Sequence, residues 1–383
     1  MAASAYPTAP HEQDVSISAA VMAHPERAEA AHALAERLPE LAPRVVYDPQ
    51  PDGPPSALRT ARLAWSLAAP DATHHVVLQD DAQPVADFLP RLRELLAARP
   101  TDAVSLFTEW GSRTAHAVRL AAMLGYTLAP VVDDYIPCVG LVLPTGVALG
   151  FEAYAQAEEA NGAPDDVALL GHLVERRVRT VIPVANLADH DQESSSLVGN
   201  SVFGPRKGAC LPPASAVPAG EHTLLTGLST IPYYDFWGQY ADACLPDAAT
   251  LDGWERTSAR AALRQRGITE QYLATALEEA LTRVPGHARL TDRLGEIPLF
   301  EVWIVAFLHG VVAADLAREH AVSLDLEAPV ARAALATLGP GAVRRVVPAR
   351  WLPAVGEWLQ PLVLEGVRAG AAVAEGKRDP AMA

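Results

Sequence analysis

The sequence predicts an α/β protein: a mostly parallel sheet flanked by helices in the first half, followed by an all-α C-terminal domain. Three observations support this prediction. The 383 residues are 50% hydrophobic, which is enough to bury the cores of about two domains. Up to about residue 200, short apolar runs alternate with helical patterns, as they do in parallel α/β sheets. From about Asp252 onward the pattern is almost entirely helical.

The elements follow in order along the first 200 residues. Apolar runs predict strands over 15–22, 44–47, 74–78, 103–107, 139–143 and 179–184. Helical periodicity predicts a helix that opens at His24 and further helices over 56–67, 88–98 and 166–177. Ser56 is the expected N-cap of the second of these helices, because its hydroxyl can accept a hydrogen bond from the first turn.

Changes in composition divide the chain into four expected segments. These are a disordered tail over 1–13, the sheet domain over 14–205, a linker over 206–250 and a helical domain over 251–383. The linker is indicated by FGPRKGACLPPASAVPAG, which is rich in Pro and Gly. The helical domain carries no recognisable motif, and we expect it to select an acceptor or to form a homodimer.

Composition excludes several classes of function. The chain has 30 basic and 46 acidic residues, a net charge of −16, which opposes binding to duplex nucleic acid or to an anionic membrane. Its three cysteines lie far apart, and we expect them to be buried apolar groups. The N-terminus lacks the pattern of a signal peptide, and the apolar stretch 300–316 is interrupted as in a buried helix. We therefore expect a soluble, cytoplasmic protein without a membrane span.

The segment THHVVLQDDAQPVADF, residues 73–88, is the most informative for chemistry. Its apolar strand delivers two carboxylates, Asp80 and Asp81, to the edge of the sheet where α/β proteins bind ligands. Adjacent carboxylates suit a hard cation such as Mg²⁺ or Mn²⁺. A solvated turn at the end of a strand explains the same pattern, and spacing alone does not separate the two interpretations.

A second acidic pair begins a predicted helix. Pro164 is followed by Asp165 and Asp166, and carboxylates in a first helical turn are favoured by the helix dipole alone. The functional interpretation is a general base that accepts the proton of an attacking hydroxyl.

Five motifs in this order resemble the GT-A glycosyltransferases, of the kind found in families 2 and 25. They are the first strand with His24-Pro25-Glu26-Arg27, the strand end at Asp48, Gln79-Asp80-Asp81, Pro164-Asp165-Asp166, and NLADHDQESSSLVGN over 186–200. The resemblance covers about half of the chain, residues 14–205. It implies a Rossmann-like domain that uses a nucleotide-sugar donor, in which paired acids form the DXD motif. Gln79 departs from that motif, because a strict D-x-D would carry a carboxylate there.

The resemblance also implies roles for individual residues. A divalent metal, Mn²⁺ or Mg²⁺, is expected at Asp80, Asp81 and His190, and His190 favours manganese. Asp81 is the expected direct ligand, with Asp80 directed toward the ribose or a metal-bound water, and the reverse assignment of the two acids stays open. Asp166 is expected to be the general base of an inverting transfer, and Asp165 to hold another acceptor hydroxyl. Donor-binding residues are expected at Ala23, His24, Arg27, Asp48, Arg59, Asp80, Ser195 and Asn200, the last two in a flap over the donor. Arg59 and Arg62 share a helical face and can meet the diphosphate or pair with surface acids.

Aromatic residues offer two further candidates. Trp110 is placed to stack on a sugar or to lie in the core. A denser aromatic cluster serves either as an acceptor platform or as the seam that docks the helical domain, and it consists of Tyr233, Tyr234, Phe236, Trp237 and Tyr240.

We therefore expect a metal-dependent, inverting glycosyltransferase that uses a UDP-sugar and a saccharide, natural-product or peptide acceptor. The sequence has no P-loop, no G-x-S-x-G and no G-x-G-x-x-G. A sugar nucleotidyltransferase would carry a glycine-rich loop after the first strand, where AAVMAHPERAE has no glycine. A non-catalytic scaffold or assembly protein built on the same kind of domain is the alternative from another class.

Overall fold

A seven-stranded mixed sheet organises the first half of the chain. The computed structural model describes residues 15–159, 161–190, 200–220 and 222–377. The strand order is β2-β1-β3-β7-β5-β8-β6, and β1, β2, β3, β5 and β8 run in one direction while β7 and β6 oppose them. The bounds are β1 Ile17–Ala23, β2 Arg44–Tyr47, β3 His74–Gln79, β5 Ala103–Ser105, β6 Leu128–Pro130, β7 Gly140–Pro144 and β8 Thr180–Pro183. The predicted α/β class with a mostly parallel sheet is confirmed.

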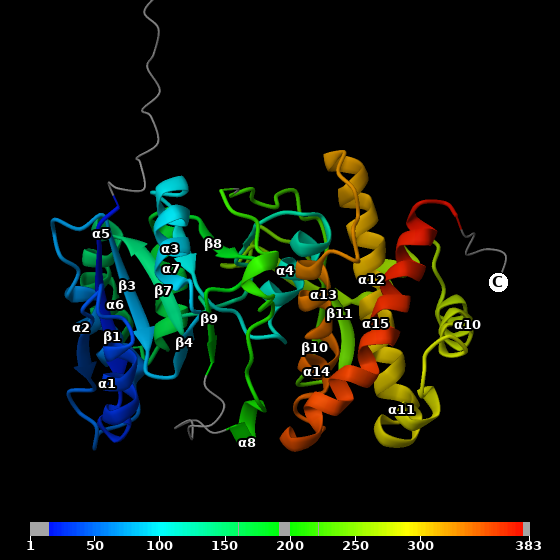
Figure 1. Cartoon of the computed structure of the whole chain (residues 1–383), viewed down its shortest axis with the longest axis horizontal. Coiled ribbons are helices and arrows are strands. Elements are labelled where there is room, and N and C mark those ends of the chain that lie inside the picture. The colour runs from blue at the N-terminus through cyan, green and yellow to red at the C-terminus, as the bar shows by residue number, and fades with distance from the viewer. Residues whose placement is uncertain (1–14, 160, 191–199, 221, 378–383) are drawn as a thin grey trace, which may run out of the picture.

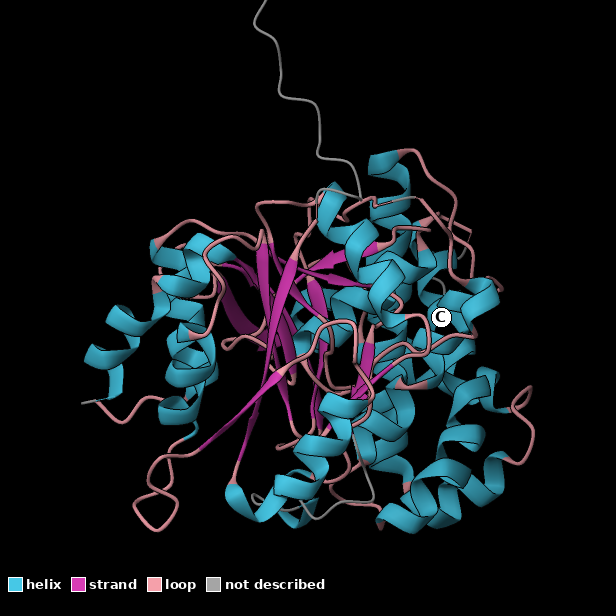
Figure 2. Ribbon diagram, turned by 60° about the vertical axis from the view of Figure 1, so that its left-hand side comes forward, coloured by secondary structure: helices cyan, strands magenta, loops and turns pink. Residues whose placement is uncertain are grey.

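Helices cover both faces of this sheet (Figure 2). Successive side chains of a strand point to opposite faces, so Val76 and Leu78 of β3 pack into one core while Val77 packs into another. The first core is closed by α1 Ala28–Glu36 and α3 Phe88–Ala98. The second core is closed by α2 Ala57–Ser66, α5 Thr145–Leu149, α6 Phe151–Glu159 and α7 Asp165–Glu175. Both faces of the sheet are therefore buried, as continuous apolar strands require.

A separate two-stranded ribbon extends from the end of β3. It pairs β4 Ala82–Pro84 with β9 Ala188–His190 in antiparallel register, so Ala82 lies opposite His190. The ribbon joins two segments about a hundred residues apart in the sequence and places β9 beside the residues that follow β3.

The structure differs from the expected irregular linker over 206–250. Residues 231–246 form β10 Ile231–Asp235 and β11 Tyr240–Pro246, which pair with β12 Trp254–Ser258 in a small antiparallel sheet. The run IPYYD is buried throughout, so it lacks the alternation of polar and apolar residues that reveals a half-exposed strand. The linker indicated by the Pro- and Gly-rich run over 203–220 was therefore extended in error across these strands.

The C-terminal part is mainly helical, as expected, and packs around α12 Glu296–His320 and α15 Leu352–Ala374 (Figure 1). These two long helices approach closely at glycines: a Cβ on Gly310 would lie 2.0 Å from the Val367 carbonyl oxygen, and one on Gly370 would lie 1.9 Å from that of Phe307. Around them lie α9 Ala259–Arg264, α10 Glu270–Leu281, α11 His287–Leu294, α13 Pro329–Ala336 and α14 Leu338–Val343. Helix α4, Arg113–Met123, belongs to the same continuous apolar core.

One helix of the described residues, α12, is long and apolar enough to cross a membrane. Of its most apolar window, 83% is buried inside the protein. This burial agrees with the expectation of a core helix in this region.

Candidate functional site

The candidate residues gather where the parallel strands end. Because β1, β2 and β3 run in the same direction, their carboxyl ends meet at one edge of the sheet. The residues that follow these ends are His24 after β1, Asp48 after β2 and Asp80 after β3. The sheet therefore brings together the first three predicted motifs.

Asp48 and Arg59 form a two-pronged ion pair at this edge. The Arg59 Nε lies 3.1 Å from Asp48 Oδ1, and its Nη2 lies 2.9 Å from Oδ2. The Asp48 amide donates to the Ala23 carbonyl at 3.2 Å, which fixes the pair beside β1. Burial raises the pKa of Asp48, but hydrogen bonds from Arg59 and from the Gln50 amide outweigh it, so the pKa lies below its usual value. Arg62 instead pairs with Glu152 and Glu159 of α6, as the surface interpretation expects.

Asp80 is held by Arg27. Arg27 Nε lies 2.6 Å from Asp80 Oδ1, and both side chains are about nine-tenths buried. Burial raises the pKa of Asp80, the charge of Arg27 lowers it and the charge of Asp81 raises it again, with a net increase. The backbone of His24 also hydrogen-bonds this carboxylate. A buried acid and arginine thus lie beside the β1 end.

The ribbon brings His190 to Asp81. Nε2 of His190 lies 3.0 Å from Asp81 Oδ2, and the His190 side chain is 2% exposed. Burial raises the pKa of Asp81, but the hydrogen bond and charge of His190, together with Arg206 and Arg27, bring it below its usual value. The second oxygen, Asp81 Oδ1, is buried and has no hydrogen-bond partner among the residues that the structure describes.

The expected metal site fits this geometry in part. A carboxylate with an unpartnered oxygen beside an imidazole offers two ligands suited to Mn²⁺. Asp80 does not complete a three-ligand set, since its carboxylate faces Arg27. Within the described ranges, no group of three or more His, Cys, Asp or Glu is arranged to hold a metal. Ser195 lies outside the described residues, and Asn200 begins the short helix α8, Asn200–Phe203.

Asp165, which precedes Asp166, is connected to the β3 end through Cys138. Gln79 Nε2 donates to Cys138 Sγ at 3.4 Å, and the Cys138 thiol donates to Asp165 Oδ2 at 3.6 Å. Burial raises the pKa of Asp165. For Asp166, burial followed by the charges of Asp165 and Asp134 raises the pKa to about 6. A carboxylate with such a pKa is largely ionised at neutral pH and still basic enough to accept a proton.

Sequence reasoning missed several residues of this edge. Arg206, which lowers the pKa of Asp81, lies in the segment interpreted as a linker. Glu109, after β5, accepts a 2.6 Å hydrogen bond from Arg344, whose side chain is fully buried and stacks on Phe236 at 3.9 Å. Arg344 comes from the C-terminal half, and no motif or spacing in the sequence could have linked it to Glu109. Cys138 was interpreted only as a buried apolar group.

The aromatic candidates divide into buried and exposed residues. Trp110 is 6% exposed and donates its indole N–H to the Pro205 carbonyl at 3.0 Å, so its ring is not available to stack on a sugar. Tyr233, Tyr234 and Phe236 are buried in the seam that joins α4 to the C-terminal helices. The other two members of the cluster are partly exposed, Trp237 at 48% and Tyr240 at 42%. Arg345 lies 3.8 Å from the centroid of the Trp237 ring, so one face of that ring is already covered.

Comparison with known proteins adds no family to this geometry. No protein-family model matches the chain, and no curated protein matches it.

Proposed function

We propose that this protein is a nucleotide-sugar-dependent glycosyltransferase of the GT-A type, with the donor bound at the carboxyl edge of the sheet. The observation that carries the proposal is the contact of Asp81 with His190, because these residues come from the two motifs that the resemblance assigns to one metal. The ribbon that joins them supports this assignment. The same edge holds Arg27 and Arg59, and Arg206 acts electrostatically on Asp81, although the chain is strongly acidic overall.

The proposed role of each residue follows from the chemistry of its side chain. Asp81 and His190 hold the divalent metal, which when bound neutralises negative charge on the donor's diphosphate. Asp48 accepts hydrogen bonds from the nucleoside, and Arg59 holds Asp48 in place. Arg27 positions Asp80 and adds positive charge beside the phosphates.

Asp166 is proposed as the general base. It takes the proton of the acceptor hydroxyl while that oxygen forms its bond to the anomeric carbon and the bond from that carbon to the diphosphate oxygen breaks. A single displacement of this kind inverts the configuration at the anomeric carbon. Its raised pKa, about 6, is the property that this role needs. The acceptor is a saccharide, natural product or peptide hydroxyl.

The proposal is tested by donor turnover. The purified full chain is incubated with Mn²⁺ and each common UDP-sugar, and released UDP is measured with and without a panel of acceptors. We expect slow UDP release from one donor, lost in Asp81→Asn although that variant keeps the wild-type circular dichroism spectrum. Near-normal release by Asp81→Asn would contradict the assignment. No release from sugars of UDP, GDP, CDP or dTDP would favour a non-catalytic scaffold.

A further inference from the structure

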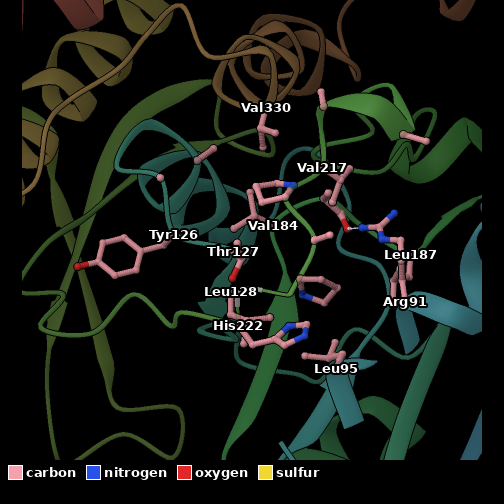
Figure 3. Close-up of a pocket in the computed structure, with 18 of the residues that line it drawn as sticks. Arg91, Leu95, Tyr126, Thr127, Leu128, Val184, Leu187, Val217, His222 and Val330 are labelled. Atoms are coloured by element: carbon pink, nitrogen blue, oxygen red, sulfur yellow. Dashed lines mark hydrogen bonds between the residues drawn. The ribbon is translucent and has the colours of Figure 1, made fainter. Parts of the chain in front are cut away.

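A concave site is lined by residues other than those discussed so far. It is a cavity of about 390 Å³ at the carboxyl end of β8, between α3, the segment 214–220 with His222, and the start of α13 (Figure 3). None of the predicted site residues lines it. Its walls are mainly apolar, and they include Leu95, Leu128, Val184, Leu187, Val217 and Val330. A volume of this size is in the range that holds a small organic molecule.

Most polar groups around the cavity are already engaged. Arg91 donates to the Ala185 carbonyl at 2.7 Å and pairs with Asp87 at 3.4 Å. The Thr127 hydroxyl accepts from the Thr223 amide at 2.9 Å. The ring of Tyr126 points away from the cavity in Figure 3, and its hydroxyl hydrogen-bonds His320 at 2.7 Å. These groups shape the wall and leave little capacity for a ligand.

His222 and Glu94 are different. Nε2 of His222 is buried and has no hydrogen-bond partner within the described part of the chain. The nearest Glu94 oxygen, Oε1, lies 3.7 Å from it, beyond hydrogen-bond distance. Burial lowers the pKa of His222, so its ring is neutral at neutral pH. A neutral imidazole and a carboxylate thus lie side by side in the wall of the cavity, without a hydrogen bond between them.

The chemistry of this pair selects one kind of ligand group. A hydroxyl can donate to the Glu94 carboxylate and, at the same oxygen, accept from His222 Nε2–H. A ligand carboxylate would face the like charge of Glu94. The rest of the cavity favours an apolar ligand, because each Å² of apolar surface that is buried contributes about 25 cal/mol to the free energy of binding.

We propose that this cavity is a binding site for a small apolar alcohol or phenol, whose hydroxyl bridges His222 and Glu94. The site is independent of the proposed transferase site, because the two share no residues. Its occupancy therefore does not require the proposed activity.

The test uses 2-naphthol and naphthalene, two probes that differ by one hydroxyl, in equilibrium dialysis against the full chain. We expect one 2-naphthol to bind per chain, about tenfold more tightly than naphthalene. A tenfold difference in affinity corresponds to about 1.4 kcal/mol, which we assign to the hydrogen-bonded hydroxyl. In His222→Phe, the affinity for 2-naphthol is expected to fall to that for naphthalene, and naphthalene is expected to bind still.

A second pair of variants tests whether the probes bind in the cavity: one fills the cavity, and a matched control places the same residue elsewhere. Val217 lies on a surface segment, so Val217→Trp is expected to keep the fold and to abolish binding of both probes. Val346→Trp, at a valine 54% exposed and outside the lining, is expected to bind like the wild type. Equal affinity for the two probes in the wild-type chain, or unchanged binding in Val217→Trp, would overturn the proposal.

Discussion

Asp166 is held in an environment that opposes its charge. Burial and the neighbouring carboxylates of Asp165 and Asp134 raise its pKa to about 6, so the ionised form is less stable in the folded chain than in water. Because the folded-state pKa is raised, the associated stability is present at acidic pH and is lost as the pH rises through about 6. A purely structural residue gains nothing from this arrangement, whereas a general base does.

We therefore predict that Asp166→Asn abolishes transfer and stabilises the fold at neutral pH. Removing the disfavoured charge is expected to raise the free energy of unfolding by an amount on the order of 2 kcal/mol, measured by urea denaturation at pH 7.5. Asp71→Asn, at an exposed aspartate, is the control and is expected to change neither property. A destabilised Asp166→Asn, or one with wild-type turnover, contradicts this account.

The pH dependence of the proposed activity of the wild-type protein offers a separate test of the same residue. Protonated Asp166 cannot accept the acceptor's proton, so kcat/KM is expected to fall about tenfold per pH unit below about 6. Initial rates between pH 4.5 and 8 measure this limb. A rate that stays flat down to pH 5 would exclude Asp166 as the base.

Individual candidate residues could be chosen from the sequence, but their contacts could not. Asp48 and Arg59 were both predicted for the donor site, yet nothing in the spacing indicates that they pair with each other. Asp80 was expected to help bind a metal, but its carboxylate forms an ion pair with Arg27. Such pairings depend on side-chain directions within about an ångström, which a pattern of residue types does not specify.

At the scale of elements, the β4–β9 ribbon determines the geometry of the site. Asp189 in β9 accepts from the amide of Gly208 at 2.7 Å and from that of His190 at 2.9 Å. Its carboxylate therefore links the ribbon to the segment of chain that contains Gly208. We expect the position of His190 to depend on this attachment.

We predict that Asp189→Ala weakens nucleotide binding although its side chain is not a proposed ligand. Loss of hydrogen bonds to a charged acceptor is expected to destabilise the fold by about 1–3 kcal/mol, measured by thermal unfolding. Asp189→Asn keeps an accepting oxygen and is expected to retain most of both properties. If the alanine and asparagine variants behave alike, the ribbon attachment is not what positions His190.

Elements with clear periodicity were predicted, and those without it were missed. The strands β1, β3 and β7 and the helices α2, α3 and α7 follow the expected patterns closely. Helix α4 was not predicted, because it is buried on all sides, including its histidine and arginines, and so shows no apolar stripe. The strands of the ribbon are three residues long, too short for any pattern.

At the scale of the whole molecule, a buried histidine pair joins the two halves of the sequence. His116 of α4 and His309 of α12 lie 3.2 Å apart between ring nitrogens. His309 Nδ1 donates to the Val305 carbonyl, and His116 Nε2 accepts from the Tyr234 amide, so both rings are neutral. Burial, together with the charge of Arg119 beside it, lowers the pKa of His309 to about 3.

This pair predicts sensitivity to acid. The unfolded chain protonates His309 near pH 6.5, whereas the folded chain does so only near pH 3. Stability is therefore complete above about pH 6.5 and falls towards pH 3, by about 1.4 kcal/mol per pH unit for each such histidine. Melting temperatures between pH 4 and 8 measure this slope. His309→Leu is expected to flatten it, and an unchanged slope in that variant would contradict the prediction.

The proposed function requires the carboxyl edge of the sheet to bind a nucleoside diphosphate together with a divalent metal. Isothermal titration of the full chain with UDP, with and without Mn²⁺, measures this binding. We expect saturable binding of one UDP that weakens at least tenfold without Mn²⁺ and is lost in Asp81→Asn. UDP binding that is equally strong without metal, or unaffected by Asp81→Asn, would overturn the proposed donor site, as would a lack of binding by UDP, GDP, CDP and dTDP alike.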